Sequence, residues 1–371
     1  MIIGVLKEIK EQESRVSCTP YSVNELIKSG HKVYLEKDAG LASGFSNEDY
    51  ERNGAIVFDT AEEVWTKSEM IYKVKEPIEC EFKYLREGLI IYSYLHLAAD
   101  EKLANELLKK KCISIAFETI QIGKLLPLLK PMSEVAGRMA VQEGAKFLTK
   151  PQGGKGVLLQ GVPGVVPAHV VIIGAGVVGT AATRMAVGMG ARVTVIDIDV
   201  ERLGVLCDIF GGVIETLYST PHNIASAVKS ADMVISTILI PGRKAPKLVT
   251  EEMVKTMEAG SVIVDVAIDQ GGSTETTAGR ATTHNNPTFV KHGVIHYAVT
   301  NIPGAVARTS TYALSNATTK YAKIIADLGW VEAVKKHDDI KKGINTYDGK
   351  ITYKAVAESL NREYSDILDL I

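Results

Sequence analysis

The sequence predicts an α/β protein with two domains, each built on a parallel sheet that is covered by helices. Short apolar runs alternate with amphipathic stretches along nearly the whole chain, which is typical of strands joined by helical crossovers. This alternation stops around Pro127 and Pro131 and restarts at His169. The length of 371 residues also favours two domains, at about 150 residues each.

The first series of strands and helices lies before Pro127. Two helices are expected at 22–29, which Gly30 closes, and at 100–111, where apolar residues recur at helical spacing. The expected strands are the apolar runs 2–6, 31–36, 70–75, 89–95 and 112–118.

The second series begins with a long helix expected at 133–149, for which Ser133 is a candidate N-cap. A further long helix is expected at 309–330, and a short helical tail at 353–371. Strands are expected at 169–173, 191–197, 231–237, 261–269 and 294–301. We therefore predict a discontinuous domain made of residues 1–130 and 305–371, and a second domain at 131–304. Long helices would link the two domains, with a cleft between them.

A glycine turn carries the strongest functional signal. Gly174, Gly176 and Gly179 follow an apolar strand and open a helix rich in small residues, and Asp197 ends the next strand. This order is typical of a Rossmann-like dinucleotide site, where the pyrophosphate meets the N–H groups of the helix N-terminus. Asp197 would bind the adenine ribose hydroxyls and repel a 2′-phosphate, which favours NAD, although Arg202 could accommodate that phosphate. The alternative is a turn that merely packs tightly.

Composition excludes several other classes of function. Apolar residues make up 46 % of the chain, charged residues make up 23 %, and the net charge of −2 favours neither nucleic acid nor an anionic membrane as a partner. No apolar run reaches the roughly 20 residues of a membrane helix. The cysteines form no CxxC pair, so we expect a reducing, cytoplasmic environment. They stand at Cys18, Cys80, Cys112 and Cys207.

Four ionisable residues follow expected strands, where open α/β sheets bind their ligands. Lys75, His96 and Asp269 close the runs 70–75, 89–95 and 261–269, and Arg15 lies in the loop after the first strand. Each also has a structural interpretation: a surface arginine, a solvated lysine, a hydrogen-bonded histidine or a turn-forming aspartate.

A metal site is a further possibility that the residues raise. His292 and His296 are four residues apart, with His284 nearby, but no Glu or Cys completes a ligand set in the sequence. We interpret these histidines as structural and expect no metal.

With these features in place, the chain resembles the family of bacterial alanine dehydrogenase and the related NAD-binding subunit of transhydrogenase, essentially from end to end. The glycine turn within 161–182 is common to both branches, whereas PMSEVAGRMA at 131–140 and the histidine of YLHLAAD at 94–100 resemble the dehydrogenase branch. Further matching segments are 4–10, 73–77, 240–246, 265–272, 281–288 and 301–314.

The resemblance implies NAD-dependent, reversible oxidative deamination of L-alanine to pyruvate and ammonium, in a homohexamer. It implies that Arg15 and Lys75 bind the substrate and that His96 and Asp269 form the catalytic pair. Besides the glycines, the cofactor residues that it implies are Ser133, Val177, Asp197, Arg202, Ser219, Ile238, Leu239, Val266, Ala267, Ile268, Asp269, Arg280, Val299, Asn301 and Ile302. Two alternatives stay open: a related amino-acid or opine dehydrogenase, and a non-catalytic NAD-binding subunit of a transhydrogenase.

Overall fold

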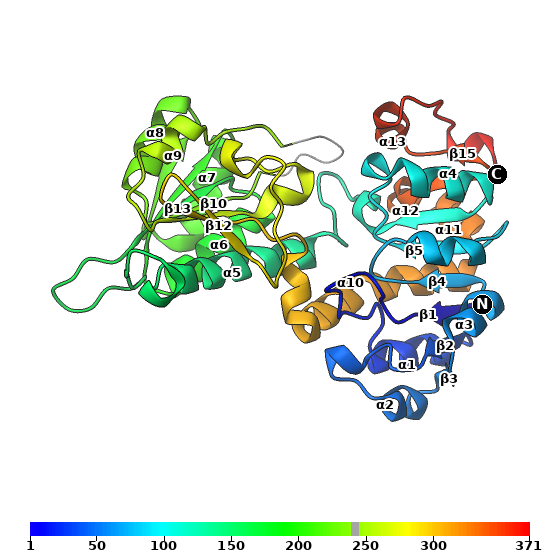
Figure 1. Cartoon of the computed structure of the whole chain (residues 1–371). Helices are drawn as coiled ribbons and strands as arrows, with labels where there is room; N and C mark the ends of the chain where they lie inside the picture. The colour runs from blue at the N-terminus through cyan, green and yellow to red at the C-terminus, as the bar shows by residue number, and fades with distance from the viewer. Residues whose placement is uncertain (239–244) are drawn as a thin grey trace. The chain divides into compact units, whose positions relative to one another are not determined.

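The computed structural model describes residues 1–238 and 245–371. The chain divides into two compact units, which are Met1–Met132 with Gly304–Ile371, and Ser133–Pro303. It passes from the first unit to the second within helix α5 (Lys130–Phe147) and returns within the 3₁₀ helix η8 (Ile302–Val306). In Figure 1 the C-terminal segment, coloured orange to red, lies in the unit that the N-terminal third forms.

The first unit contains a mixed sheet with the strand order β15-β14-β6-β5-β4-β1-β2-β3. Strands β1 to β6 are all parallel, and their order corresponds to the doubly wound pattern 3-2-1-4-5-6. The switch point, where ligands bind in this fold, therefore lies beyond the carboxyl ends of β1 and β4. The strands are β1 (Ile2–Val5), β2 (Lys32–Glu36), β3 (Ile56–Phe58), β4 (Met70–Tyr72), β5 (Ile90–Ser93), β6 (Ile113–Ala116), β14 (Ile344–Tyr347) and β15 (Lys350–Ile351).

Helices cover both faces of this sheet, so its central strands β5 and β6 are buried along their whole length. Thr19 caps α1 and Asp100 caps α4, and each accepts a backbone N–H of the first turn. The helices are α1 (Pro20–Lys28), α2 (Asn47–Arg52), α3 (Ala61–Lys67), α4 (Glu101–Lys109), α10 (Ala307–Leu328), α11 (Trp330–Lys336), α12 (Asp338–Gly343) and α13 (Lys354–Ser359).

The second unit contains a sheet with the order β12-β13-β11-β10-β7-β8-β9, which includes the same 3-2-1-4-5-6 pattern. Its switch point lies between β7 and β10. Among the described strands of this sheet, only β12 is antiparallel to its neighbour. The strands are β7 (His169–Ile173), β8 (Arg192–Asp197), β9 (Ile214–Tyr218), β10 (Met233–Ser236), β11 (Val262–Asp265), β12 (Thr288–Lys291) and β13 (Val294–Tyr297). With α5, its helices are α6 (Val177–Gly188), α7 (Val200–Phe210), α8 (Pro221–Ser230) and α9 (Glu251–Lys255).

The predicted α/β class with two mostly parallel sheets is confirmed, and several local expectations are wrong. Ser133 is not an N-cap, because α5 already begins at Lys130; Pro131 is tolerated in the first turn, where its missing N–H has no intrahelical partner. The strand expected at 261–269 ends at Asp265, and a 3₁₀ helix, η6 (Val266–Gln270), follows. Much of the tail expected to be helical at 353–371 is not, since α13 ends at Ser359.

Strands β3, β9, β12, β14 and β15 were not predicted. β14 pairs antiparallel with β6 through a register irregularity, and the hydroxyls of Thr346 and Ser114 are hydrogen bonded at 2.7 Å in the core. These contacts join residues more than 200 positions apart, so no local pattern indicates them.

No helix in the described part of the chain is both long and apolar enough to cross a membrane.

Candidate functional site

The glycine turn joins β7 to α6 in the second unit. Gly174 has φ of 107°, and a Cβ there would lie 2.6 Å from the Thr237 hydroxyl at the end of the neighbouring strand. A Cβ on Gly179 would lie 1.8 Å from the Gly174 carbonyl oxygen, so only glycine lets α6 lie this close to the turn. A Cβ on Gly176 would meet no atom within 4 Å. The space beside Gly176, at the N-terminus of α6, therefore suits a phosphate group.

Two charged side chains converge on this turn from β8 and α7. The Asp197 carboxylate accepts the backbone N–H of Ala175 at 2.5 Å and that of Asp199 at 2.9 Å. The Arg202 guanidinium donates to the Ala175 carbonyl at 2.9 Å and to the Thr180 hydroxyl at 2.6 Å. A carboxylate and a guanidinium therefore both lie where the adenosine half of a dinucleotide is expected. Thr180 and Thr237 were not predicted, because hydroxyl residues carry no motif of their own here.

The other predicted cofactor residues of the second unit mostly follow parallel strands, whose carboxyl ends share one edge of the sheet. Val177 is the first residue of α6, and Ser133 lies within α5. Leu239 lies outside the described residues. After the strands come Ser219 (β9), Ile238 (β10), Val266, Ala267, Ile268 and Asp269 (β11), and Val299, Asn301 and Ile302 (β13).

Arg280 lies in a separate arrangement before β12. Its guanidinium carbon is 4.0 Å from the centroid of the Phe289 ring, and Phe289 stacks on His296 at 4.9 Å. Burial lowers the pKa of His296 to about 4, with a smaller contribution from the charge of Arg280. The imidazole is therefore neutral near pH 7.

Arg15 is buried in the loop after β1 and is held by Glu13. The guanidinium donates through Nε to Glu13 at 2.7 Å and through Nη2 to the second carboxylate oxygen. Nη1 lies 3.0 Å from the Met132 sulfur. Burial alone would raise the pKa of Glu13, but the hydrogen bonds and charge of Arg15 outweigh it and lower the pKa to about 2. Glu13 therefore stays ionised and orients the guanidinium, a role that its position two residues before Arg15 could have indicated.

Lys75 lies three residues beyond the end of β4. Because β4 is adjacent to β1, Lys75 and the Arg15 loop both lie at the switch point of the sheet. Its backbone N–H donates to Glu8 at 3.3 Å. Burial and then the charge of Arg15 lower the pKa of the Lys75 ammonium. The two cations that sequence analysis selected are therefore brought within electrostatic reach of each other.

His96 follows β5 and has a left-handed backbone conformation, with φ of 50°. The backbone N–H of His96 donates to the Glu118 carboxylate at 2.6 Å, and the backbone N–H of Leu95 donates to the same carboxylate at 3.2 Å. The imidazole stacks on the Tyr94 ring at 5.9 Å and is half exposed. Glu118 was not predicted, although it ends the apolar run 112–118 as a carboxylate placed beyond a strand.

Asp269 is exposed within η6, four residues beyond the end of β11, and not at the strand end where the sequence suggested it. Asp265 holds that position. It is buried, and its carboxylate accepts the N–H groups of Ser273 at 3.0 Å and Thr274 at 3.1 Å and the hydroxyl of Thr277 at 2.5 Å. Asp265 therefore fixes the loop that follows, while Asp269 remains accessible to a ligand.

The three histidines considered as a metal site have separate partners. His292 lies 2.6 Å from Glu251, His296 lies 2.7 Å from the Thr276 hydroxyl, and His284 lies 3.2 Å from a backbone carbonyl. Among the residues that the structure describes, no three His, Cys, Asp or Glu side chains are grouped as metal ligands.

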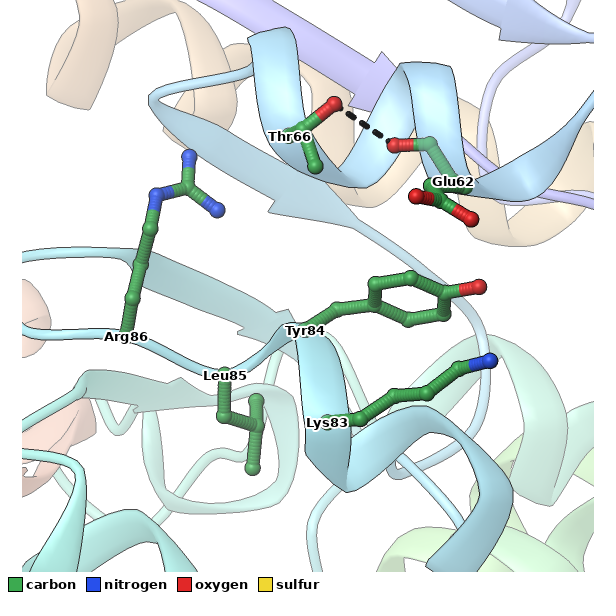
Figure 2. A pocket seen from close by; sticks show the side chains of 6 residues that line it. All are labelled: Glu62, Thr66, Lys83, Tyr84, Leu85 and Arg86. Atoms are coloured by element: carbon green, nitrogen blue, oxygen red, sulfur yellow. Dashed lines mark hydrogen bonds between the residues drawn. The ribbon is translucent and has the colours of Figure 1, made fainter.

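A surface pocket of about 440 Å³ lies in the first unit, lined by residues that include Glu62, Lys83, Tyr84 and Arg86 (Figure 2). Arg86 donates to the carbonyl of Trp65 at 2.8 Å and to that of Ser68, just before β4 begins. The pocket therefore lies at the amino ends of the strands, opposite the edge that carries Lys75 and His96, and we assign it no substrate.

The fold and these contacts define a class: a two-domain α/β protein with a dinucleotide-binding unit and a second doubly wound unit that carries a buried arginine and a partly buried lysine at its switch point. Residues 4–136 match the N-terminal domain, and residues 140–354 the C-terminal domain, of the alanine dehydrogenase/PNT family. The chain belongs to this family.

Individual relatives cover nearly the whole chain. It is 57 % identical over 366 residues to the alanine dehydrogenase of Methanococcus maripaludis, covering 98 % of both chains. It is 58 % identical over 364 residues to that of Bacillus subtilis, covering 98 % of this chain and 96 % of the relative. A solved structure titled L-alanine dehydrogenase matches with a TM-score of 0.93 at 47 % identity, covering 97 % of this chain and 99 % of that one.

Proposed function

We propose that the protein is an NAD-dependent alanine dehydrogenase, which reversibly converts L-alanine and water to pyruvate and ammonium. Relatives that carry this name are 57 and 58 % identical over almost the full length. The observation that carries the proposal is the pair of cations at the switch point of the first unit: Arg15, oriented by Glu13, and Lys75. Such a pair suits a small α-carboxylate.

Arg15 would bind the substrate carboxylate. The Nε–Nη2 edge of the guanidinium faces Glu13, and Nη1 lies against the Met132 sulfur, which is a weak acceptor. A carboxylate that reaches the guanidinium would form charge-assisted hydrogen bonds, which are much stronger than a bond to sulfur. Lys75 would bind the same carboxylate or the keto oxygen of pyruvate.

The second unit would bind NAD. The glycine turn and the N-terminus of α6 would bind the pyrophosphate, and Asp197 the ribose hydroxyls, because the open space at Gly176 and the carboxylate at the end of β8 fit these groups. The bound nicotinamide supplies a hydride acceptor, or as NADH a donor. Arg280, Ser219 and the residues after β11 and β13 would complete the site.

His96 would transfer the protons. Loss of hydride leaves the substrate α-carbon as an iminium, and water attacks it while His96 takes one water proton. His96 then returns this proton to the amine of the carbinolamine; the C–N bond breaks, and the hydroxyl proton passes to the departing ammonia, which gives pyruvate and ammonium. Histidine suits both steps because it titrates near neutrality. Glu118 holds the backbone at His96, and Asp269 would orient the amine.

The assay follows NADH absorbance with pyruvate and ammonium, and then with glyoxylate, 2-oxobutyrate or 2-oxoglutarate, and with NADPH. We expect rapid oxidation of NADH with pyruvate and ammonium and much slower oxidation of NADPH. No oxidation with pyruvate and ammonium would refute the proposal, and a requirement for a second amino acid in place of ammonium would indicate an opine dehydrogenase.

The homohexamer and a role in L-alanine catabolism remain predictions that rest on resemblance, and the cytoplasmic location remains a prediction that rests on the cysteine pattern. Light scattering on the purified protein would measure the mass of the assembly against a chain mass of 40.1 kDa.

A further inference from the structure

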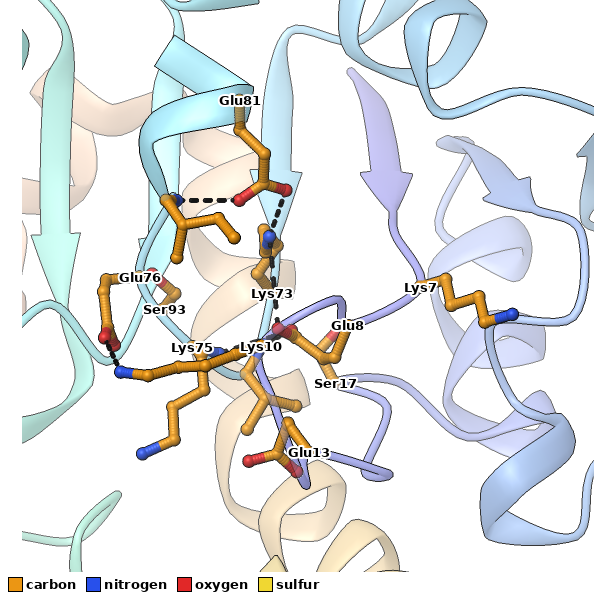
Figure 3. Close-up of polar contacts among 12 residues, drawn as sticks. Lys7, Glu8, Lys10, Glu13, Ser17, Lys73, Lys75, Glu76, Glu81 and Ser93 are labelled. Carbon is orange, nitrogen blue, oxygen red and sulfur yellow. Dashed lines mark hydrogen bonds and ion pairs between the residues drawn. The ribbon is translucent and has the colours of Figure 1, made fainter. Parts of the chain in front are cut away.

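Glu8 lies in the centre of a buried group of charges beyond β1. Its carboxylate accepts the backbone N–H of Val74 at 2.6 Å and that of Lys75 at 3.3 Å. Its second oxygen lies 4.0 Å from the ammonium of Lys73, which is also paired with Glu81. Figure 3 shows this arrangement, with the Lys75 side chain extending away from the Glu8–Lys73 pair.

Carboxylates that accept backbone N–H groups beyond a neighbouring strand occur at other strand ends of this sheet. Glu36, at the end of β2, accepts the N–H of Lys7 just beyond β1 at 2.9 Å. Glu118, beyond β6, accepts the N–H of His96 beyond β5. In each case a carboxylate from one strand holds the backbone that follows the adjacent parallel strand. Glu8 performs this role between β1 and β4, which is the switch point of the unit.

The position of Glu8 links two loops that carry substrate candidates. Glu8 begins the loop that leads to Arg15, and it binds the backbone of the loop that carries Lys75. Hydrogen bonds to an ionised acceptor are roughly twice as strong as neutral ones. Loss of the Glu8 charge would therefore loosen the Lys75 loop without removing any group that touches substrate.

We propose that Glu8 is a positioning residue for substrate binding: its buried carboxylate holds the Lys75 backbone so that Lys75 and Arg15 can bind the oxo acid together. This inference rests on the proposed function for the roles of Arg15 and Lys75.

Burial makes the protonation state of Glu8 sensitive to pH near neutrality. Burial raises the pKa of Glu8 to about 7, against the lowering effect of Lys73. The other charged groups of its surroundings, on the loops after β1 and β4, on η2 (Glu79–Tyr84) and on β2, are Glu13, Arg15, Lys75, Glu81 and Glu36. Glu8 would take up a proton as the pH falls from about 8 to 6, and pyruvate binding would weaken over that range.

The first test compares Glu8→Gln with the wild-type enzyme in steady-state kinetics. We expect the KM for pyruvate to rise about threefold, because the amide oxygen still accepts the two N–H groups but loses the charge that strengthens these hydrogen bonds, with the KM for NADH changed less than about twofold. Glu36→Gln is the matched control, because it removes a carboxylate near the same Lys73 but not the hold on Lys75. It should leave both constants unchanged.

The second test is the pH profile of the KM for pyruvate between pH 6 and 8.5. The wild-type KM should rise as the pH falls through about 7, and Glu8→Gln should remove this dependence. An unchanged KM with the wild-type pH profile retained would overturn the inference, as would an equal rise in the KM for NADH.

If Glu8→Gln does not fold, Glu8→Asp gives the same test, because its shorter side chain keeps the charge but retracts from Val74 and Lys75. A KM for pyruvate equal to that of the wild type would then contradict a positioning role. A wild-type enzyme inactive with pyruvate and ammonium would instead refute the proposed function.

Discussion

One oxygen of Glu118 accepts the backbone N–H of His96 at 2.6 Å and lies 4.0 Å from Nδ1 of the His96 imidazole. The carboxylate therefore holds the main chain of His96, which has a left-handed conformation, and also faces its ring. Glu118 comes from the loop after β6, so the geometry of His96 depends on the pairing of β5 with β6.

His96→Ala should lower kcat by about 10²-fold or more, because general acid–base catalysis typically contributes 10²–10⁴-fold. The binding constant for NADH, measured by fluorescence titration, should not change, since His96 belongs to the other unit. A kcat near the wild-type value would remove His96 from the proposed role.

Glu118→Ala should lower kcat roughly tenfold through loss of a hydrogen bond to a charged group. Glu118→Gln keeps an acceptor for the His96 N–H and should recover most of that loss. Equal activity of the two variants would contradict a role in holding the backbone.

Arg15→Lys should raise the KM for pyruvate by roughly 10- to 100-fold. A guanidinium can bind Glu13 along one edge and the substrate with its remaining N–H groups, whereas a lysine ammonium lacks this fork geometry. The KM for NADH is the internal control. An unchanged KM for pyruvate would reject Arg15 as the carboxylate ligand.

Asp197→Ala should raise the ratio of kcat/KM for NADPH over NADH by at least about tenfold, because a carboxylate opposite a phosphate costs several kcal/mol. Adding Arg202→Ala should cancel much of this gain, since Arg202 lies at the same turn. Asp199→Ala is the control, because Asp199 caps α7. A constant cofactor ratio would refute the ribose assignment.

Gly179→Ala and Gly188→Ala place the same methyl group at two sites of α6. At Gly179 it would lie 1.8 Å from the Gly174 carbonyl oxygen, so we expect loss of NADH binding and a lower Tm. At Gly188 nothing lies within 4 Å, and alanine should stabilise the helix by up to about 1 kcal/mol. Equal Tm values for the two variants would contradict the close approach of α6 to the turn.

The buried His296 should make stability depend on pH. Its pKa is about 4 in the folded protein and about 6.5 in the unfolded chain, so the unfolded state takes up the proton first as the pH falls below 6.5. Between pH 6.5 and 4 the free energy of unfolding should fall by about 3 kcal/mol through this group. The Tm difference between the wild type and His296→Gln, measured at pH 7.5 and 5, isolates the effect. A difference that does not change with pH would contradict it.

The sequence alone predicted the α/β class and the glycine turn, because both depend on residues that are close together in the chain. The strand before Gly174, the glycine spacing and Asp197 at the next strand end form one local pattern, and the structure contains each part of it. Arg15, Lys75 and His96 were selected by a rule about strand ends that needs no coordinates, and their roles remain proposals.

Only the tertiary structure identified the carboxylates that hold these residues. Glu8 and Glu118 appear in the sequence as ordinary charged residues, and their function depends on which strands are adjacent in the sheet. Strand order is determined by the packing of segments far apart in the chain: β1 lies beside β4, and β6 beside β5. The end of β11 at Asp265, four residues before Asp269, was decided in the same way, because buried N–H groups of the following loop require an acceptor there.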